Sequence, residues 1–219
     1  MDKKPITCVF VDDHEMVLEA LVAQFQRSPR IRVVGTAGSV DEMLPLLGRT
    51  APDVLVVDVN LPGRDIFDVA ADLKRRWPET RILILTGFLA DIFIEQALKQ
   101  GIAGYLLKSE PLKELVSAIE RVAAGEPVFS KAVAERLTFD PGTSQYVVRH
   151  ESDLSALTLR QLEVLRHLAC GQSVKEISTM MKLSQKSVDS HKYRIMNKLG
   201  IHDRVLLARF AIREGLMVP

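Results

Sequence analysis

The first 124 residues alternate continuous apolar runs with stretches in which apolar residues recur at helical spacing. The apolar runs lie near residues 6–11, 32–37, 53–58, 81–86 and 103–107. The amphipathic stretches lie near residues 14–27, 39–49, 64–77, 90–100 and 111–124. Strands that are apolar on both faces are typical of parallel sheets covered by helices on both sides. Five such units in succession predict an α/β fold built on a five-stranded, doubly wound parallel sheet.

The last third of the chain changes to an all-helical pattern with defined start and stop residues. Thr158 and Gln161 have the spacing of a capping box, and Gly171 ends the helix that they begin. Further helices are predicted near residues 174–182, 185–199 and 204–214. Ser184, in the short turn before the third helix, is its expected cap. This order predicts a small all-α helix-turn-helix unit, in which the third helix could enter a DNA major groove.

A segment of mixed character separates the two regions. Ser130–Leu137 has the pattern of a short helix, whereas Asp140–Gln145 combines Pro, Gly, Thr and Ser and predicts a mobile tether. We therefore expect domains at residues 1–124 and 154–219, joined by a linker over 125–153.

Composition limits the class of protein. Hydrophobic residues make up 47% of the 219, which supports two ordinary cores. No segment approaches the roughly 20 apolar residues of a membrane span, and the first residues lack an apolar signal region. Cys8 and Cys170 lie inside apolar patterns, which predicts two buried, reduced thiols and a cytoplasmic location without membrane contact.

Charge is distributed unevenly along the chain. Residues 152–219 carry 11 Lys and Arg against 6 Asp and Glu, whereas residues 1–124 carry 15 against 18. A basic excess often belongs to a solvated helical surface, but it also suits a short module that contacts phosphates.

Polar residues end four of the five apolar runs. Asp12 and Asp13 follow the first run, Asp58 the third, Thr86 the fourth and Lys108 the fifth. Because the carboxyl ends of parallel strands open at one edge of a sheet, we expect these side chains to converge. Three carboxylates form an oxygen-rich pocket suited to Mg²⁺. Asp58 is the expected nucleophile, because a carboxylate can accept a phosphoryl group, while Thr86 donates a hydrogen bond and Lys108 supplies positive charge.

This set of residues resembles the receiver domain of two-component response regulators, a flavodoxin-like fold, over about residues 5–124. The resemblance implies that Asp58 is the phosphoacceptor, Thr86 the hydroxyl switch residue, Lys108 the invariant lysine and Tyr105 the rotating aromatic residue. It also implies the following Mg²⁺ ligands: Asp12, Asp13, Asp58 and the main-chain oxygen of Asn60. Gly87 matches a position that the family keeps small. Ile66 departs from the pattern, because many members have glycine there.

The helical region resembles the LuxR-type DNA-binding domain of NarL/FixJ response regulators over about residues 154–217. The motifs that carry the likeness are Leu157–Leu165, Lys175–Ser178, Ser187–His191 and Lys198–Gly200. We expect DNA contacts from the exposed side of the third helix, at Lys186, Asp189, Ser190, Lys192, Tyr193 and Arg194. Asp189 replaces a lysine found in many relatives, and it could accept a hydrogen bond from cytosine N4. In the family the last helix pairs two such domains.

Together these resemblances imply a DNA-binding transcriptional response regulator that a sensor histidine kinase switches by phosphorylating Asp58. The expected partners are that kinase, a double-stranded DNA operator, a second copy on activation and, as a further candidate, RNA polymerase. We expect no dedicated enzyme. A regulator of the same architecture that acts independently of phosphorylation is the alternative.

Two enzyme classes fit the sequence poorly. A phosphatase of the haloacid dehalogenase type would need a second carboxylate where Asn60 stands. A dinucleotide-dependent enzyme would need a glycine-rich turn after the first strand, where the chain has Asp12–Glu15. Taken singly, the polar residues have plainer explanations: an Asp-Asp pair is commonly solvated, Tyr105 could be ordinary core, and His14 and His191 suit a helix start and a packing position.

Overall fold

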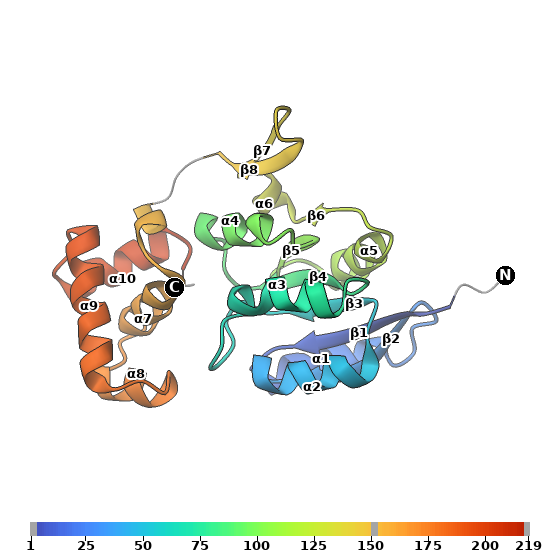
Figure 1. Cartoon of the computed structure of the whole chain (residues 1–219), viewed down its shortest axis with the longest axis horizontal. Helices are drawn as coiled ribbons and strands as arrows, with labels where there is room; N and C mark the ends of the chain where they lie inside the picture. Colours follow the sequence, from blue (N-terminus) through green and yellow to red (C-terminus); the bar gives the residue numbers. More distant parts are fainter. Residues whose placement is uncertain (1–3, 150–152, 217–219) are drawn as a thin grey trace. The chain divides into compact units, whose positions relative to one another are not determined.

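A computed structural model of the chain describes residues 4–149 and 153–216. It consists of two compact units, one of Met1–Thr86 with Gln96–Glu135, the other of Gly87–Glu95 with Arg136–Pro219. Figure 1 shows the elements in chain order.

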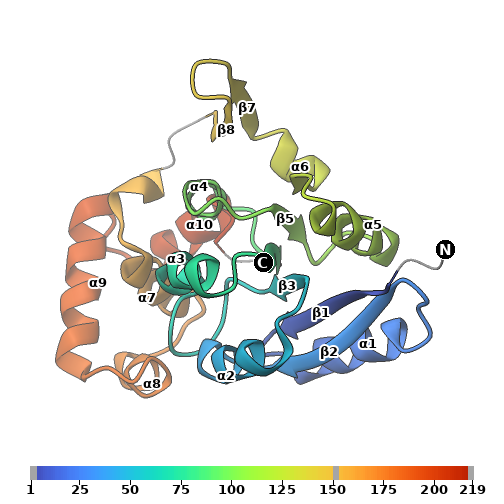
Figure 2. The ribbon, with the colours of Figure 1, turned by 45° about the vertical axis from the view of Figure 1, so that its right-hand side comes forward.

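The first unit contains a parallel sheet with the strand order β2-β1-β3-β4-β5-β6. The strands are β1 (Ile6–Val11), β2 (Ile31–Ala37), β3 (Val54–Val57), β4 (Arg81–Thr86), β5 (Gly104–Leu107) and β6 (Val128–Phe129). β1 lies second from one edge of the sheet, with β2 outside it, and β3, β4, β5 and β6 follow in order on its other side; Figure 2 shows β1 beside β2. The doubly wound fold is therefore confirmed, with six strands instead of five. The additional strand β6 has only two residues, too few for a periodic pattern in the sequence.

Helices follow the strands and cover both faces of this sheet. They are α1 (Glu15–Phe25), α2 (Val40–Thr50), α3 (Ile66–Arg76) and α5 (Leu112–Ala123). The helix after β4, α4 (Asp91–Lys99), is divided between the two units. Ser39 caps α2 by accepting a hydrogen bond from the Glu42 amide, and Asp65 caps α3 in the same way through the Phe67 amide. These caps fix the points at which the chain leaves each loop, because the first helical amides have no partner within the helix.

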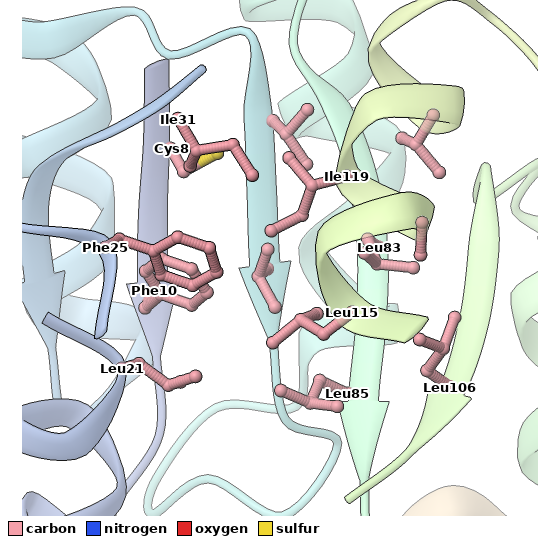
Figure 3. Packing of buried hydrophobic residues seen from close by; sticks show 14 of the residues in the cluster. Cys8, Phe10, Leu21, Phe25, Ile31, Leu83, Leu85, Leu106, Leu115 and Ile119 are labelled. Atoms are coloured by element: carbon pink, nitrogen blue, oxygen red, sulfur yellow. The ribbon is translucent and has the colours of Figure 1, made fainter. Parts of the chain in front are cut away.

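The core on one face of the sheet joins α1, α5 and alternate strand residues. Figure 3 shows Phe10 packed against Phe25, with ring centroids 5.5 Å apart, and Leu115 and Ile119 of α5 lying over β3 and β4. Residues such as Val9 and Val57, which alternate with these along the strands, are also buried and face the opposite side. Burial on both faces explains why the strands form continuous apolar runs.

The second unit contains a hairpin followed by four helices. The short helix α6 (Lys131–Ala134) precedes the hairpin in the chain and confirms a helix inside the predicted linker. The hairpin pairs β7 (Leu137–Asp140) with β8 (Gln145–Val148) in antiparallel register. The prediction of a mobile tether over Asp140–Gln145 was therefore wrong, because these residues turn the chain between two paired strands.

The helical part begins with a 3₁₀ turn, η1 (Asp153–Ala156), and continues with α7 (Leu159–Ala169), α8 (Val174–Met180), α9 (Gln185–Leu199) and α10 (Arg204–Arg213). The capping box of Thr158 and Gln161 is confirmed, and Ser173 with Glu176 forms a second one. Gly200 ends α9 in the left-handed conformation, at φ 65°. The core residues shared by these helices are fully buried: Leu162, Leu165, Ile177, Val188, Ile195 and Leu207.

The two cysteines differ in their surroundings. Cys8 is buried in β1, and burial, followed by the negative charge of Asp53, raises the pKa of its thiol to about 12. Cys170 is exposed, contrary to the sequence prediction, because it stands at the C-terminal end of α7, where the chain leaves the helix.

We therefore expect iodoacetamide to alkylate one thiol of the folded protein at neutral pH. Only a thiolate that solvent can reach reacts quickly, so Cys170 should be labelled and Cys8 should react only after unfolding in urea. Peptide mass mapping locates the label. Equal labelling of both thiols under native conditions would contradict the buried position of Cys8.

Candidate functional site

The polar residues predicted from the sequence lie side by side at the carboxyl edge of the sheet. The backbone ladder continues one residue beyond the strands: the Asp58 amide donates to the Val11 carbonyl at 2.9 Å, and the Lys108 amide to the Thr86 carbonyl at 2.7 Å. The Asp12 amide likewise donates to the Ala37 carbonyl. These bonds hold the side chains in the register of the sheet, so the predicted convergence at one edge is observed.

Lys108 joins two carboxylates at the centre of this cluster. Its Nζ atom lies 2.6 Å from Oδ2 of Asp12 and 2.7 Å from Oδ2 of Asp58. Both aspartates are buried, and the lysine side chain is only 23% exposed. Burial by itself would lower the pKa of Lys108, but the charge of Asp58 and the hydrogen bonds to both carboxylates outweigh it and raise that pKa. The lysine is therefore a charged partner of two buried carboxylates.

Asp13 and His14 complete the cluster on its open side. The ligand atoms of Asp12, Asp13, His14 and Asp58 all lie within 4.8 Å of one another. The His14 Nδ1 atom lies 2.7 Å from Oδ1 of Asp13 and 3.0 Å from Oδ1 of Asp12. His14 is also the N-cap residue of α1, as its position in the sequence indicated. The contacts of its ring with the two carboxylates were not predicted. Its position directly after the acidic pair was the feature of the sequence that could have indicated them.

The donor atoms of this cluster suit a hard divalent cation. Three carboxylates converge on one point, and Mg²⁺ favours carboxylate oxygens together with retained waters and phosphate oxygens. The backbone N–H of Asn60 donates to Oδ1 of Asp58 at 3.2 Å, which fixes the loop after β3 against the cluster. The Asn60 main-chain oxygen remains a predicted ligand.

Thr86 and Tyr105 share one face of the sheet. Ile84 of β4 pairs with Tyr105 of β5, and Thr86 lies two residues beyond Ile84, so both side chains project to the same side. Both residues are fully buried. A Cβ atom built on Gly87, the next residue, would meet nothing within 4 Å, so the space beside Thr86 is open. The arrangement therefore places a hydroxyl and an aromatic ring on adjacent strands that end at the acidic cluster.

Helix α9 presents a polar face to solvent. Its buried residues Val188 and Ile195 pack inwards, and the predicted DNA-contacting residues that lie on its exposed side are Lys186, Asp189, Ser190, Tyr193 and Arg194. Tyr193 is 68% exposed, an unusual position for an aromatic side chain. Lys192 differs from the others because it is only partly exposed, at the border of this face.

Two further side chains explain how α9 is held. Lys198 donates hydrogen bonds to the Ala156 carbonyl at 2.6 Å and to Gln161 Oε1 at 3.0 Å, which ties the end of α9 to the start of α7. The His191 Nδ1 atom is buried and has no hydrogen-bond partner within residues 4–149 and 153–216. Burial, followed by the charges of Arg160 and Arg194, lowers the pKa of His191.

No helix within the described part of the chain is long and apolar enough to cross a membrane.

Comparison with known proteins covers both units. Residues 8–120 match the response regulator receiver domain, and residues 155–211 match the luxR family of bacterial regulatory proteins. Over 212 residues the chain is 31% identical to the response regulator GacA of Pseudomonas aeruginosa, covering 97% of this chain and 98% of that protein. It is 32% identical to the transcriptional regulatory protein LiaR of Bacillus subtilis over 213 residues, covering 97% and 99%.

Among solved structures, the fold is similar to RcsB of Salmonella typhimurium, with a TM-score of 0.71 and 24% identity over 97% of this chain and all of the other. RcsB has also been solved bound to the promoter rprA in the presence of the phosphomimetic BeF₃⁻, a structure that matches with a TM-score of 0.64 over 94% of this chain and 98% of that one.

Proposed function

This chain belongs to the NarL/FixJ response regulators, and from that membership we propose that a sensor histidine kinase phosphorylates Asp58 and thereby controls the binding of the protein to double-stranded DNA. The regulator acts as a transcription factor in the cytoplasm. Its working parts are a receiver domain at residues 1–124, a linker at 125–153 and a LuxR-type domain at 154–219.

The bridge that Lys108 makes between Asp12 and Asp58 is the observation that carries the phosphorylation half of the proposal. In the transfer, an Asp58 carboxylate oxygen attacks the phosphorus atom, and the bond between phosphorus and the imidazole nitrogen of a phosphohistidine breaks. The new phosphoryl oxygens bring additional negative charge next to Nζ of Lys108, which neutralises part of it.

A divalent cation completes the charge balance. Mg²⁺ held by Asp12, Asp13, Asp58 and the Asn60 carbonyl would neutralise phosphoryl oxygens during transfer. The chain's own contribution is orientation: the sheet fixes Asp12 and Asp58 beside each other, and Lys108 holds both carboxylates in place through its ammonium group.

Thr86 and Tyr105 pass the change to the rest of the molecule. The Thr86 side chain moves towards the phosphoryl group and donates a hydrogen bond to it. This movement of Thr86 frees space beside Tyr105, which lies on the same face of the sheet. A switch of this kind needs an interaction that favours one arrangement of Thr86 and Tyr105 over the other. The negative charge of the phosphoryl group supplies that interaction.

The polar face of α9 supports the DNA half of the proposal. Residues 152–219 carry the basic excess of the chain, and Lys186 and Arg194 are exposed on α9, where they can neutralise DNA phosphates. Helix α10 exposes Val205 and Leu206 to solvent, an apolar pair that suits contact with a second copy. A dimer would read two half-sites, and RNA polymerase is a further candidate partner on the DNA.

Selection of DNA by the whole protein tests the proposal. Sequences are enriched from a random pool, and the affinity of the best sequence is measured by fluorescence anisotropy with and without acetyl phosphate plus Mg²⁺. We expect tighter and more dimeric binding after phosphorylation, and no gain in Asp58→Asn. Equal affinity in every state would contradict the switch and leave a phosphorylation-independent regulator of the same architecture.

Asp189 provides a narrower prediction about sequence selectivity. If its carboxylate accepts a hydrogen bond from cytosine N4, Asp189→Ala should lose about 1–3 kcal/mol of discrimination at one base pair and relax the selected sequence there. Lys186→Ala should instead weaken binding to all sequences and reduce the salt dependence of the affinity. A selected sequence that is unchanged in Asp189→Ala would rule out base recognition by this residue.

A further inference from the structure

A cavity lies in the first unit, apart from the acidic cluster. It has a volume of about 370 Å³, lies between α5 and β6, and is lined neither by Asp58 nor by Lys108. This volume falls in the lower part of the range of about 300–1,000 Å³ typical of small-molecule sites. Leu106, Ala118 and Val128 are buried residues of its wall and form an apolar part of a lining that also contains polar and charged residues.

A buried hydroxyl without a partner lies in the wall of this cavity. Ser130 is only 7% exposed, and its Oγ atom has no hydrogen-bond partner among the described residues. Ser130 is the N-cap residue of α6, yet its side chain makes no capping hydrogen bond. Its backbone is firmly placed, because its amide donates to the Tyr105 carbonyl at 3.0 Å. Buried hydroxyl groups are normally hydrogen-bonded, so this one points to a partner outside the chain.

Positive charge is available at the mouth of the cavity. Lys131, the next residue, is exposed and forms no ion pair within the part of the chain that the structure describes. Lys113 has only a distant partner, because its Nζ atom lies 4.0 Å from Oε1 of Glu114. Arg121, by contrast, is engaged by Glu126 at 2.8 Å. The two lysines therefore offer charge to an anion, while Glu110 and Glu114 on the same lining oppose a ligand of high negative charge.

We propose that this cavity binds a small monocarboxylic acid with an apolar body. The carboxylate accepts a hydrogen bond from the Ser130 hydroxyl and lies beside Lys131, and the apolar body lies against Leu106 and Val128. Each part of the ligand thus matches one property of the wall. The proposal goes beyond the phosphorylation switch, because it concerns a separate site that needs neither a kinase nor DNA.

Benzoate is the first probe, tested on the full-length protein in buffer without Mg²⁺ and without phosphodonor. We expect progressive amide chemical-shift changes in ¹H–¹⁵N NMR spectra at residues 129–131 and along the first half of α5. The expected dissociation constant is on the order of 1 mM, as for other ligands of this size. Benzamide, which has the same shape without the charge, should bind at least about tenfold more weakly.

Three variants test separately the contributions of the Ser130 hydroxyl group, the Lys131 charge and the free volume of the cavity to benzoate binding. Ser130→Ala should weaken benzoate binding about tenfold, the effect of one lost hydrogen bond to a charged group, without lowering Tm, because no bond within the chain is lost. Lys131→Gln should weaken it as well, whereas the matched change Lys4→Gln, at an exposed lysine outside this cavity, should not. Ser117→Phe, at an exposed position of the lining, should block the cavity and abolish the shifts.

Several results would overturn the proposal: no saturable shifts at residues 129–131, equal affinity for benzamide, or unchanged benzoate binding in Ser130→Ala. Inorganic phosphate that shifts the same amides more strongly than benzoate would also overturn the carboxylic acid assignment.

Discussion

Asp58→Asn protein incubated with acetyl phosphate and Mg²⁺ should remain unphosphorylated, whereas the wild-type chain takes up one phosphoryl group. The asparagine side chain has nearly the same shape, but its amide lacks the charged oxygen that attacks phosphorus. Intact-mass measurement after brief incubation at neutral pH detects the group directly. We expect uptake to fall below detection, the largest effect of any substitution considered for this protein.

A matched variant distinguishes this loss from a general effect of charge. Asp72 lies on the exposed side of α3, paired with Arg75 at 2.8 Å, so Asp72→Asn changes the same charge away from the acidic cluster. It should be phosphorylated like the wild-type chain. Undiminished uptake by Asp58→Asn would place the phosphoryl group elsewhere, and peptide mapping of Asp12 and Asp13 would be the next step.

Lys108→Ala should lower the free energy of unfolding by about 2–3 kcal/mol at neutral pH in metal-free buffer. The substitution leaves Asp12 and Asp58, both buried, without their shared cation, and an uncompensated buried charge is costly. The raised pKa of Lys108 means that its contribution is complete at neutral pH and is lost as the pH rises through the folded-state pKa. Urea denaturation of both proteins at pH 7 measures the difference.

The same urea denaturation is repeated in the presence of Mg²⁺. If the carboxylates hold the cation, millimolar Mg²⁺ should stabilise Lys108→Ala more than the wild-type chain, because the ion replaces the missing positive charge. Lys113→Ala, at a lysine that is 81% exposed, should change stability by no more than about 0.5 kcal/mol. Equal stability of Lys108→Ala and wild type without metal would show that the bridge makes no net contribution to folding.

The main features of both units could be predicted because they depend on short-range patterns. Continuous apolar runs identified five strands, and the rule that parallel strands open at one edge correctly predicted that Asp12, Asp58 and Lys108 lie together. Thr158 and Gly200 marked helix ends through their hydrogen bonding and backbone conformation, which are local properties. The site residues at strand ends were thus the part of the functional site that the sequence predicted best.

The features that were missed depend on context beyond a few residues. Strand β6 forms because the Val128 amide donates to the carbonyl of Ala103, just before β5, and the Ser130 amide to the carbonyl of Tyr105 in β5. A strand of two residues has no periodic pattern in the sequence. Cys170 lies in an apolar pattern, but its position at the end of α7 turns it outwards. The ring contacts of His14 depend on how the β1–α1 loop places it against two carboxylates. Each case is decided by tertiary position, which sequence spacing does not record.

The β7–β8 hairpin also bears on how far the linker can reach. Leu137 and Val148 stand opposite each other at its base, which leaves only about 5 Å between their Cα atoms. The residues between them therefore add chain length without adding span, so the segment predicted as a linker, residues 125–153, spans less distance than its residue count implies. A linker of shorter span raises the local concentration of one domain around the other. Variation in the length of the turn between the paired strands should consequently leave the span of the linker unchanged, whereas unpairing Leu137 from Val148 would lengthen it.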